Sequence, residues 1–267
     1  MRSPGTWTTN APVCATILPR CIPIVPIVIF DLDGTPPDIG FPDIALAETD
    51  PNGLLAIGGD LAPERLLAAY RQGIFPWYGI GQPILWWSPA PRMVLFPEEL
   101  HISRSLRRTL RREPFEVSVD QAFDAVIRAC AAPREQNPGT WLVTEMIAAY
   151  NALHRAGHAH SIEVWRGAEL AGGLYGIAIG QVFFGESMFS RYTDASKVAL
   201  SLLAHVARDL PFRLIDCQVY TDHLASLGAR EISRERFREQ LTQATHTETP
   251  PFGARPRNTL SAWGLVA

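Results

Sequence analysis

Residues 161–184 read SIEVWRGAELAGGLYGIAIGQVFF, and this stretch decides the fold. It contains three strand-like runs at 161–165, 170–179 and 181–184, in which apolar, β-branched and aromatic residues dominate. Arg166-Gly167-Ala168 joins the first two runs and Gly180 joins the last two, so we expect an antiparallel meander. A helix over 197–208 and a strand over 212–219 follow, and this order predicts a layered α/β (α+β) domain.

Helix signals flank the meander on both sides. Asp60, Pro63 and Gly73 supply an acidic start, a proline in the first turn and a glycine stop for one helix. Thr144 is expected to cap another helix that ends at Gly157. Further helices are expected over residues 101–112, 120–132 and 234–241, with a short one after Asp222.

The composition is that of a globular protein, since 47% of the 267 residues are hydrophobic and 19% are charged. Because 24 Lys and Arg nearly balance 27 Asp and Glu, net charge alone does not indicate a nucleic-acid binder. The four cysteines form no CxxC pair, which argues against a zinc site. The most apolar early run, at 22–30, is short, broken by prolines and without a signal-peptide cleavage site. We therefore expect a cytoplasmic protein with no membrane segment.

The two ends of the chain have no hydrophobic period, so we expect a disordered extension over residues 1–37 and a flexible tail over 243–267. Within the extension, IFDLDGT at 29–35 is typical of haloacid-dehalogenase-type phosphatases. There Asp31 would be the nucleophile and Asp33 the acid/base, with magnesium between phosphate and carboxylates. That chemistry also needs a downstream acid pair and a lysine on a later strand, and the only lysine, Lys197, lies in no such context. We therefore expect a chance match and retain a magnesium phosphatase only as an alternative.

An arginine stripe is expected on one face of the helix over residues 101–112. Its five members recur at the spacing i, i+3, i+4, i+7, i+8, and no acid interrupts them: Arg104, Arg107, Arg108, Arg111 and Arg112. Like charges so close together repel unless an anion is near. We interpret the stripe as a contact for a nucleic-acid phosphate backbone rather than as a solvated helix face.

Acidic residues within apolar runs are the candidate catalytic groups. Asp216 and Gln218 are two apart in the expected strand LIDCQV, so we expect both to project from the same face. Glu186 lies in FFGESMFS, next to a glycine that lets a ligand approach the backbone. A carboxylate on a buried strand must be paired or be functional, and the residues alone leave both readings open.

Long blocks of the chain, spanning about Phe41 to Leu241, resemble the leucyl/phenylalanyl-tRNA–protein transferases. The matching blocks are PNGLLAIGGD (51–60), GIFPW (73–77), ILWWSP (84–89), LHISR (100–104), GTW (139–141), GHAHSIEVW (157–165), GESMFS (185–190) and LIDCQ (214–218). The resemblance implies a small N-terminal domain, 38–91, and a GNAT-like acyltransferase domain with a mixed sheet, 92–242. It further implies transfer of Leu or Phe, and less well Met, from aminoacyl-tRNA to proteins with N-terminal Arg or Lys, which marks them for N-degron degradation. No metal or coenzyme is expected, and the protein is expected to be a monomer.

The resemblance also implies roles for individual residues. Asp216 and Gln218 would be the catalytic pair, with Glu186 in the same site. Trp77 and Trp141 would hold the terminal adenosine of the tRNA, and the arginine stripe would bind its backbone. The aminoacyl pocket would be lined by Leu174, Phe183, Met188, Leu200, Leu203 and Ile215. Two questions stay open: whether Asp216 is a general base or an orienting group, and whether Leu203, which replaces a larger aromatic in a relative, favours Leu or Phe.

Two further alternatives follow from the sequence. A small-molecule N-acetyltransferase would share the fold class, but residues 190–196 lack the glycine-rich turn that holds the coenzyme A pyrophosphate. A non-catalytic tRNA-binding module would need the arginine stripe but no catalytic acid.

Overall fold

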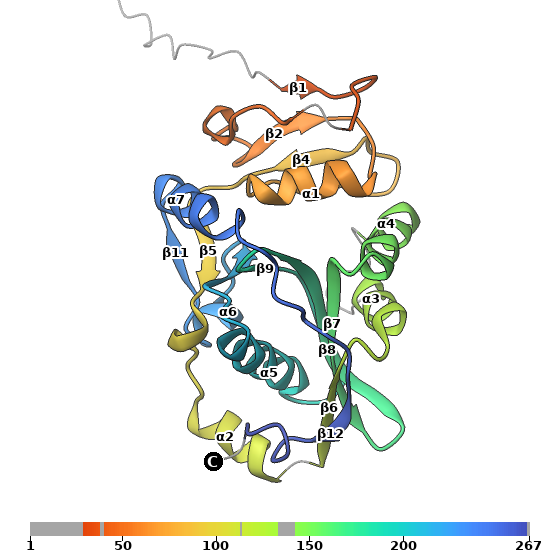
Figure 1. Ribbon diagram of the computed structural model, residues 1–267, viewed down its shortest axis with the longest axis vertical. Coiled ribbons are helices and arrows are strands. Elements are labelled where there is room, and N and C mark those ends of the chain that lie inside the picture. Colours follow the sequence, from red (N-terminus) through yellow and green to blue (C-terminus); the bar gives the residue numbers. More distant parts are fainter. Residues whose placement is uncertain (1–28, 38–39, 113, 133–141, 266–267) are drawn as a thin grey trace, which may run out of the picture.

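The computed structural model describes residues 29–37, 40–112, 114–132 and 142–265. Its largest element is an eight-stranded sheet in the order β11-β5-β10-β9-β8-β7-β6-β12 (Figure 1). The predicted meander forms its centre, where β7 (Ala159–Arg166), β8 (Glu169–Ile179) and β9 (Val182–Ser190) pair antiparallel. β10 (Leu214–Gln218) pairs parallel with β9 and antiparallel with β5 (Arg92–Leu95), which makes the sheet mixed. β11 (Arg230–Ile232) and β6 (Phe115–Val119) extend it on either side.

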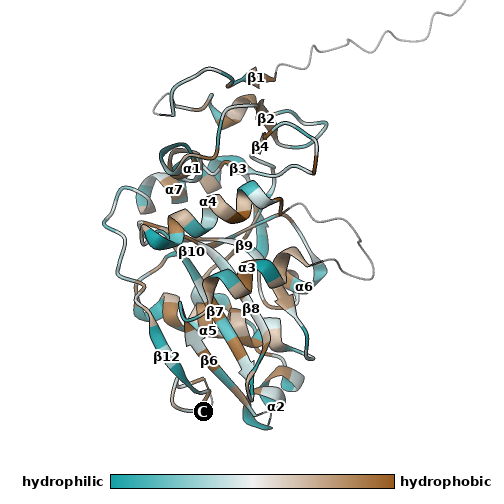
Figure 2. Ribbon diagram, turned by 90° about the vertical axis from the view of Figure 1, so that its right-hand side faces the viewer, coloured by the Kyte–Doolittle hydropathy of each residue, from teal (hydrophilic) through white to brown (hydrophobic). Residues whose placement is uncertain are grey.

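Helices cover both faces of this sheet (Figures 1 and 2). α5 (Ala195–Asp209) packs on one face against β7, β8 and β9, while α3 (Phe123–Ala131) and α4 (Thr144–Arg155) pack on the other. α5 can approach β8 closely because Gly172 has no side chain: a Cβ there would lie 2.6 Å from the Cβ of Ala195. The predicted layered α/β fold is confirmed.

A second, smaller sheet lies at the top of Figure 1 in the order β1-β2-β4-β3. Its strands are β1 (Phe30–Asp31), β2 (Leu54–Ile57), β3 (Phe75–Pro76) and β4 (Leu85–Trp87). The predicted helix of this region is α1 (Pro63–Arg71), with Pro63 in its first turn. α1 contacts both α4 and β8, so the small sheet is joined to the large one through packed helices.

The expected disordered extension over 1–37 is wrong for its last residues. β1 pairs parallel with β2, and Leu32 is buried in the core. Asp33 accepts a hydrogen bond from the backbone N–H of Gly59 at 2.8 Å, and buried Arg65 donates to the carbonyl of Thr35 at 2.6 Å. The phosphatase-like motif is therefore a structural part of the small sheet. Among the described residues, no group of three or more His, Cys, Asp or Glu is arranged to hold a metal ion.

The expected flexible tail is also wrong. β12 (Arg255–Thr259) pairs antiparallel with β6 at the edge of the large sheet. Phe252 and Leu260 are both buried on either side of it. Every residue of β12 is at least partly exposed, so an edge strand of this kind leaves no hydrophobic alternation in the sequence.

The remaining elements correct several expected boundaries. α2 (Arg104–Arg112) and α3 each begin three residues later than expected. Thr144 is the first residue of α4 rather than its N-cap, because Val143 is the N-cap residue and makes no side-chain hydrogen bond there. β9 continues six residues beyond its expected end, so Glu186 lies within a strand. The other helices are α6 (Asp222–Ala225), α7 (Arg234–Ala244) and the 3₁₀ turns η1 (Ile44–Leu46) and η2 (Pro97–Glu99). Within the described ranges, none of the helices is long and apolar enough to cross a membrane.

Candidate active site

Glu186 and Gln218 meet where the parallel strands β9 and β10 run side by side. Phe184 and Asp216 are directly paired, so the residues two positions further along each strand are brought together. The Nε2 of Gln218 donates to the Oε1 of Glu186 at 2.7 Å. Both side chains line two cavities, one on each side of the pair. The structure therefore brings together Glu186 and Gln218, two residues that were expected to share one site.

Glu186 is almost completely buried, with 8% of its surface exposed. The hydroxyl of Tyr150 donates to its Oε2 at 2.7 Å, and the hydroxyl of Tyr70 lies 2.6 Å from that of Tyr150. Burial raises the pKa of Glu186 to about 7, and the nearby charge of Asp216 adds to this, while the hydrogen bonds from Tyr150 and Gln218 and the nearby hydroxyl of Tyr70 act in the opposite direction. The site thus contains a carboxyl group that titrates near neutral pH.

Asp216 does not project into either cavity, and the expectation that it shares a face with Gln218 is wrong. The pairing of β10 with β5 is irregular between these two residues, and Gln218 has a positive φ of 64°. This change of backbone direction turns the carboxamide toward Glu186 while Asp216 points the other way. Asp216 is fully buried and makes a two-point ion pair with Arg92, at 2.8 Å and 2.6 Å.

The ion pair is connected to the site through the backbone. Asp216 Oδ1 accepts a hydrogen bond from the backbone N–H of Gln218 at 2.9 Å, which favours the left-handed conformation at Gln218. Arg92 itself lies between the rings of Phe75 and Phe237, at 4.8 Å and 4.7 Å from their centroids. The pair is therefore held by both the small sheet and α7, and sequence analysis missed Arg92 because it lies 124 residues from its partner.

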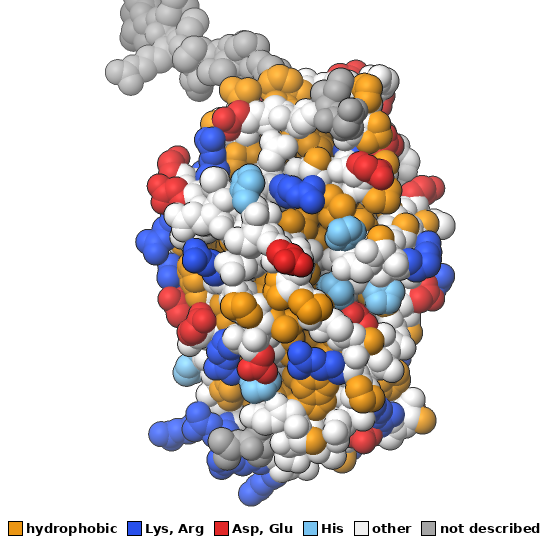
Figure 3. Space-filling view, in the orientation of Figure 1, with side chains coloured by type: hydrophobic (Ala, Val, Ile, Leu, Met, Phe, Trp, Pro, Cys, Tyr) orange, Lys and Arg blue, Asp and Glu red, His pale blue; other side chains and the backbone are white. Residues whose placement is uncertain are grey.

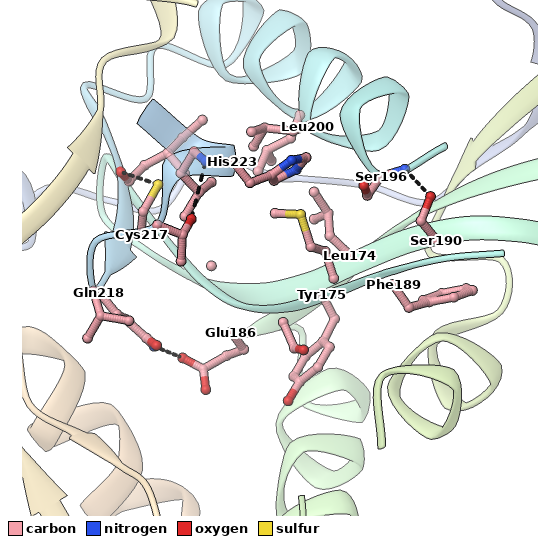
Figure 4. Close-up of a pocket in the computed structure, with 18 residues that line it drawn as sticks. Leu174, Tyr175, Glu186, Phe189, Ser190, Ser196, Leu200, Cys217, Gln218 and His223 are labelled. Atoms are coloured by element: carbon pink, nitrogen blue, oxygen red, sulfur yellow. Dashed lines mark hydrogen bonds between the residues drawn. The ribbon is translucent and has the colours of Figure 1, made fainter. Parts of the chain in front are cut away.

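The first cavity, of about 510 Å³, is mostly apolar (Figure 4). Gln218 and Glu186 face each other along one side of it, and His223, Leu200 and Ser196 lie on the opposite side. Five of the six residues expected to line an aminoacyl pocket line this cavity: Leu174, Met188, Leu200, Leu203 and Ile215.

Phe183, the sixth expected lining residue, does not reach the cavity. It is fully buried, and its ring packs against that of Phe252 with 5.6 Å between the centroids. The segment that covers it was expected to be a flexible tail, so this contact could not be anticipated. Conversely, sequence analysis missed His223, whose Nε2 is buried without a hydrogen-bond partner in the described structure. Burial and the charge of Lys197 lower the pKa of His223.

The second cavity, of about 160 Å³, lies on the other side of the Glu186–Gln218 pair. Its remaining walls are Phe75, Pro76, Trp77 and Val219. Trp77 is 47% exposed and packs edge-to-face on Trp87, whose indole N–H donates to the carbonyl of Trp77 at 2.7 Å. This exposed indole is available to a planar ligand. Trp141, the other expected adenosine contact, lies outside the described residues.

All five arginines of the predicted stripe are exposed on α2 and surround a shallow cavity of about 250 Å³. Figure 3 shows basic side chains gathered at the lower end of the molecule, where Figure 1 places α2. The helix is tied to the rest of the domain by Thr109, which donates to Asp194 at 3.1 Å, and Asp194 in turn pairs with Lys197 of α5. The stripe is thus a solvent-facing basic surface on the larger domain, which also contributes Glu186 and Gln218.

Comparison with known proteins identifies close relatives. The family model described as leucyl/phenylalanyl-tRNA protein transferase matches residues 94–242, and the model of its N-terminal domain matches residues 59–90. A leucyl/phenylalanyl-tRNA–protein transferase of Nitrosomonas europaea is 61% identical over 206 residues, which is 77% of this chain and 87% of the relative. Proteins of the same name from Pseudomonas fluorescens and Pseudomonas aeruginosa are 60% and 58% identical, over 79% and 81% of this chain and 92% and 95% of their own lengths.

Proposed function

The chain belongs to the leucyl/phenylalanyl-tRNA–protein transferase family, and on this premise we propose that it transfers leucine or phenylalanine from aminoacyl-tRNA to the N-terminus of an acceptor protein. The observation that carries the proposal is the Glu186–Gln218 pair, which forms the shared wall of two cavities. A reaction that joins two substrates needs this arrangement, because the reacting atoms of both must meet at one point.

The aminoacyl side chain occupies the larger cavity. Strands β8, β9 and β10 contribute Leu174, Met188 and Ile215, and α5 contributes Leu200 and Leu203, so the walls are apolar. A pocket of this kind selects by size, and it distinguishes side chains by only about 1–3 kcal/mol per methylene. Methionine, which is unbranched and of similar volume, therefore enters less well than Leu or Phe but is not excluded.

The tRNA binds at two places. Its terminal adenosine stacks on the exposed indole of Trp77, with Trp141 as the second expected contact, and stacking of a base on an aromatic ring contributes roughly 1–3 kcal/mol. Phosphates of the acceptor stem bind the arginine stripe of α2, whose five side chains surround one shallow cavity.

Charged tRNA is found in the cytoplasm, where the protein acts as a monomer.

The ester bond of aminoacyl-tRNA is already activated, so the protein has to orient the two substrates. The neutral α-amine of the acceptor attacks the ester carbonyl carbon, a C–N bond forms, and the bond to the ribose oxygen breaks. One amine proton is transferred to the departing ribose oxygen, which balances the reaction. Gln218 donates through Nε2 to Glu186, so its Oε1 faces outward to accept a hydrogen bond from the amine and direct its lone pair.

Glu186 also accounts for the acceptor preference. An ionised carboxylate with its two oxygens bonded to Gln218 and Tyr150 still has lone pairs for a cation, and it lines the smaller cavity beside Trp77. The side chain of an N-terminal Arg or Lys supplies that cation, and the modified acceptor then enters the N-degron pathway. Asp216 acts as a positioning residue, because it reaches the substrates only through the backbone of Gln218.

The test is transfer of labelled leucine from tRNA to a protein with an N-terminal arginine, with an otherwise identical acceptor that begins with aspartate as its control. We expect label on the first acceptor and little on the second. Gln218→Asn is the matched variant, because asparagine tolerates the positive φ but shortens the carboxamide by one methylene. It should retain the fold and lose most of the transfer. Absence of label on every acceptor, or full transfer by Gln218→Asn, would contradict the proposal.

A further inference from the structure

We propose that Tyr150 and Tyr70 form a two-hydroxyl relay that holds the Glu186 carboxylate against Gln218, so that a helix of the small N-terminal layer positions the group that receives the acceptor. The inference rests on the proposed function in one respect: it takes Glu186 to act in the transfer. The relay joins three elements, since Tyr70 lies on α1, Tyr150 on α4 and Glu186 on β9.

The relay is buried along its whole length. Tyr70 and Tyr150 are each 1% exposed and Glu186 is 8% exposed. The hydroxyl-to-hydroxyl distance is 2.6 Å and the hydroxyl-to-carboxylate distance is 2.7 Å, both within the normal range of O–H···O hydrogen bonds. Because water does not compete with these contacts, their loss is not compensated by solvent.

The relay has a direction. Tyr150 donates its single hydroxyl proton to Glu186, so the shared bond with Tyr70 must use the proton of Tyr70. On the other oxygen of Glu186 the partner is also a donor, the Nε2 of Gln218. Two donors converge on the carboxyl group, and a protonated Glu186 would have to turn its own O–H away from both. The relay therefore favours the ionised form that a cationic acceptor needs.

The groups that face Glu186 oppose one another. Tyr150 from α4 and Gln218 from β10 stabilise its charge by donating hydrogen bonds, and Tyr70 from α1 supports it through the hydroxyl of Tyr150, while burial and the charge of Asp216 disfavour it. Arg92 of β5 acts on Asp216 rather than on Glu186 directly. These opposing effects leave the pKa of Glu186 at about 7. Because this value is close to physiological pH, the loss of one hydrogen bond changes the ionised fraction of Glu186 in the cell.

A third tyrosine provides the internal control. Tyr175 of β8 is fully buried and packs edge-to-face on Tyr150 with 5.5 Å between the ring centroids. Its hydroxyl has no hydrogen-bond partner in the described structure. Tyr175→Phe therefore removes a buried hydroxyl from the same cluster without breaking the relay. Because Tyr175 also lines the larger cavity, the control is the position of the acidic limb rather than the overall rate.

The experiment measures leucine transfer between pH 5.5 and 9 for wild type, Tyr150→Phe, Tyr70→Phe and Tyr175→Phe. The acceptor amine gives the same pH dependence in every variant, so differences from wild type report on the protein. A hydrogen bond to a charged group is worth about one pKa unit or slightly more, so Tyr150→Phe should move the acidic limb upward by about one pH unit, with about tenfold less transfer at the lowest pH and recovery at pH 9. Tyr70→Phe should cause a smaller shift, and Tyr175→Phe none.

A second measurement follows the ionisation of Glu186 directly, so its result does not depend on the transfer rate or on partial misfolding of a variant. The carboxyl carbon of Glu186 is titrated by ¹³C NMR in the same proteins, with Glu186→Gln used for assignment. We expect a midpoint near 7 in wild type and about one unit higher in Tyr150→Phe. An unmoved midpoint, an unmoved acidic limb, or an equal loss of rate at every pH would overturn the relay. Absence of transfer by wild type would instead overturn the proposed function, while the titration still decides the relay.

Discussion

Replacing the buried Arg92–Asp216 pair separates its contribution to stability from its contribution to the reaction. The side chains are 1% and 0% exposed and form two hydrogen bonds of 2.8 Å and 2.6 Å. Asp216→Ala leaves a buried guanidinium without its counter-charge, and removal of one partner of such a pair is expected to lower the free energy of unfolding by about 3–5 kcal/mol. Domains of ordinary stability, about 5–15 kcal/mol, survive such a loss at low temperature.

The double variant Arg92→Met/Asp216→Leu removes both charges and keeps similar volume. Exchange of a buried ion pair for apolar residues is often neutral or stabilising, so most of the lost stability should return. Transfer should not return, because the backbone N–H of Gln218 no longer has the Oδ1 of Asp216 as its acceptor. The positive φ at Gln218 is then unsupported, and a displacement of about 1 Å of the carboxamide is enough to lower the rate by about 100-fold.

The assay combines urea unfolding with leucine transfer for wild type, both single variants and the double variant, and tRNA binding is measured as a control that should change little. Wild-type transfer by the double variant would refute the reasoning, because it would show that Asp216 does not act through Gln218. An unchanged free energy of unfolding in Asp216→Ala would refute the stability argument, because it would show that the buried guanidinium of Arg92 does not need the Asp216 carboxylate as its counter-charge.

Three further outcomes are expected. Because the pKa of Glu186 rises from 4.5 to about 7 on folding, the native state holds the proton more tightly, so the free energy of unfolding should fall by about 3 kcal/mol as pH rises from 4.5 to 7. Glu186→Gln should flatten this slope in urea titrations at several pH values. Charge reversal at Arg107, Arg108 and Arg111 should weaken tRNA binding and reduce the slope of log K against log[salt] by about 2–3 in filter-binding assays. Leu203→Phe narrows the larger cavity and should shift the Leu-to-Phe transfer ratio by about tenfold toward Leu, measured with both charged tRNAs in competition.

The elements that could be predicted are those whose signals are local. The meander of β7, β8 and β9 and the helix α1 follow from residues a few positions apart, namely runs of apolar, β-branched and aromatic residues, a turn glycine and a proline at a helix start. The edge strands β1 and β12 could not be predicted, because their short and mostly exposed segments carry no such pattern. Both depend on a partner strand that is distant in sequence.

The orientation of Asp216 illustrates the limit of strand periodicity. Regular alternation predicts that residues two apart share a face, and this fails where the β10–β5 pairing shifts between Asp216 and Gln218. Glutamine has no intrinsic preference for a positive φ, so its identity gives no warning. The conformation is stabilised by the Oδ1 of Asp216, itself held by Arg92.

By itself the sequence determined which chemical groups are present and the family to which the chain belongs. The groups are an acid and an amide in one apolar strand, a second acid in another apolar run, tryptophans expected to hold the adenosine, and an arginine stripe. Only the tertiary structure decided which of these groups meet. Arg92 and Asp216 are 124 residues apart, and Tyr70 and Tyr150 are 80 apart. Contacts over such separations depend on how whole strands and helices pack, and no periodicity within one segment encodes them. For that reason the relay to Glu186 and the support of Gln218 emerged only from the folded chain.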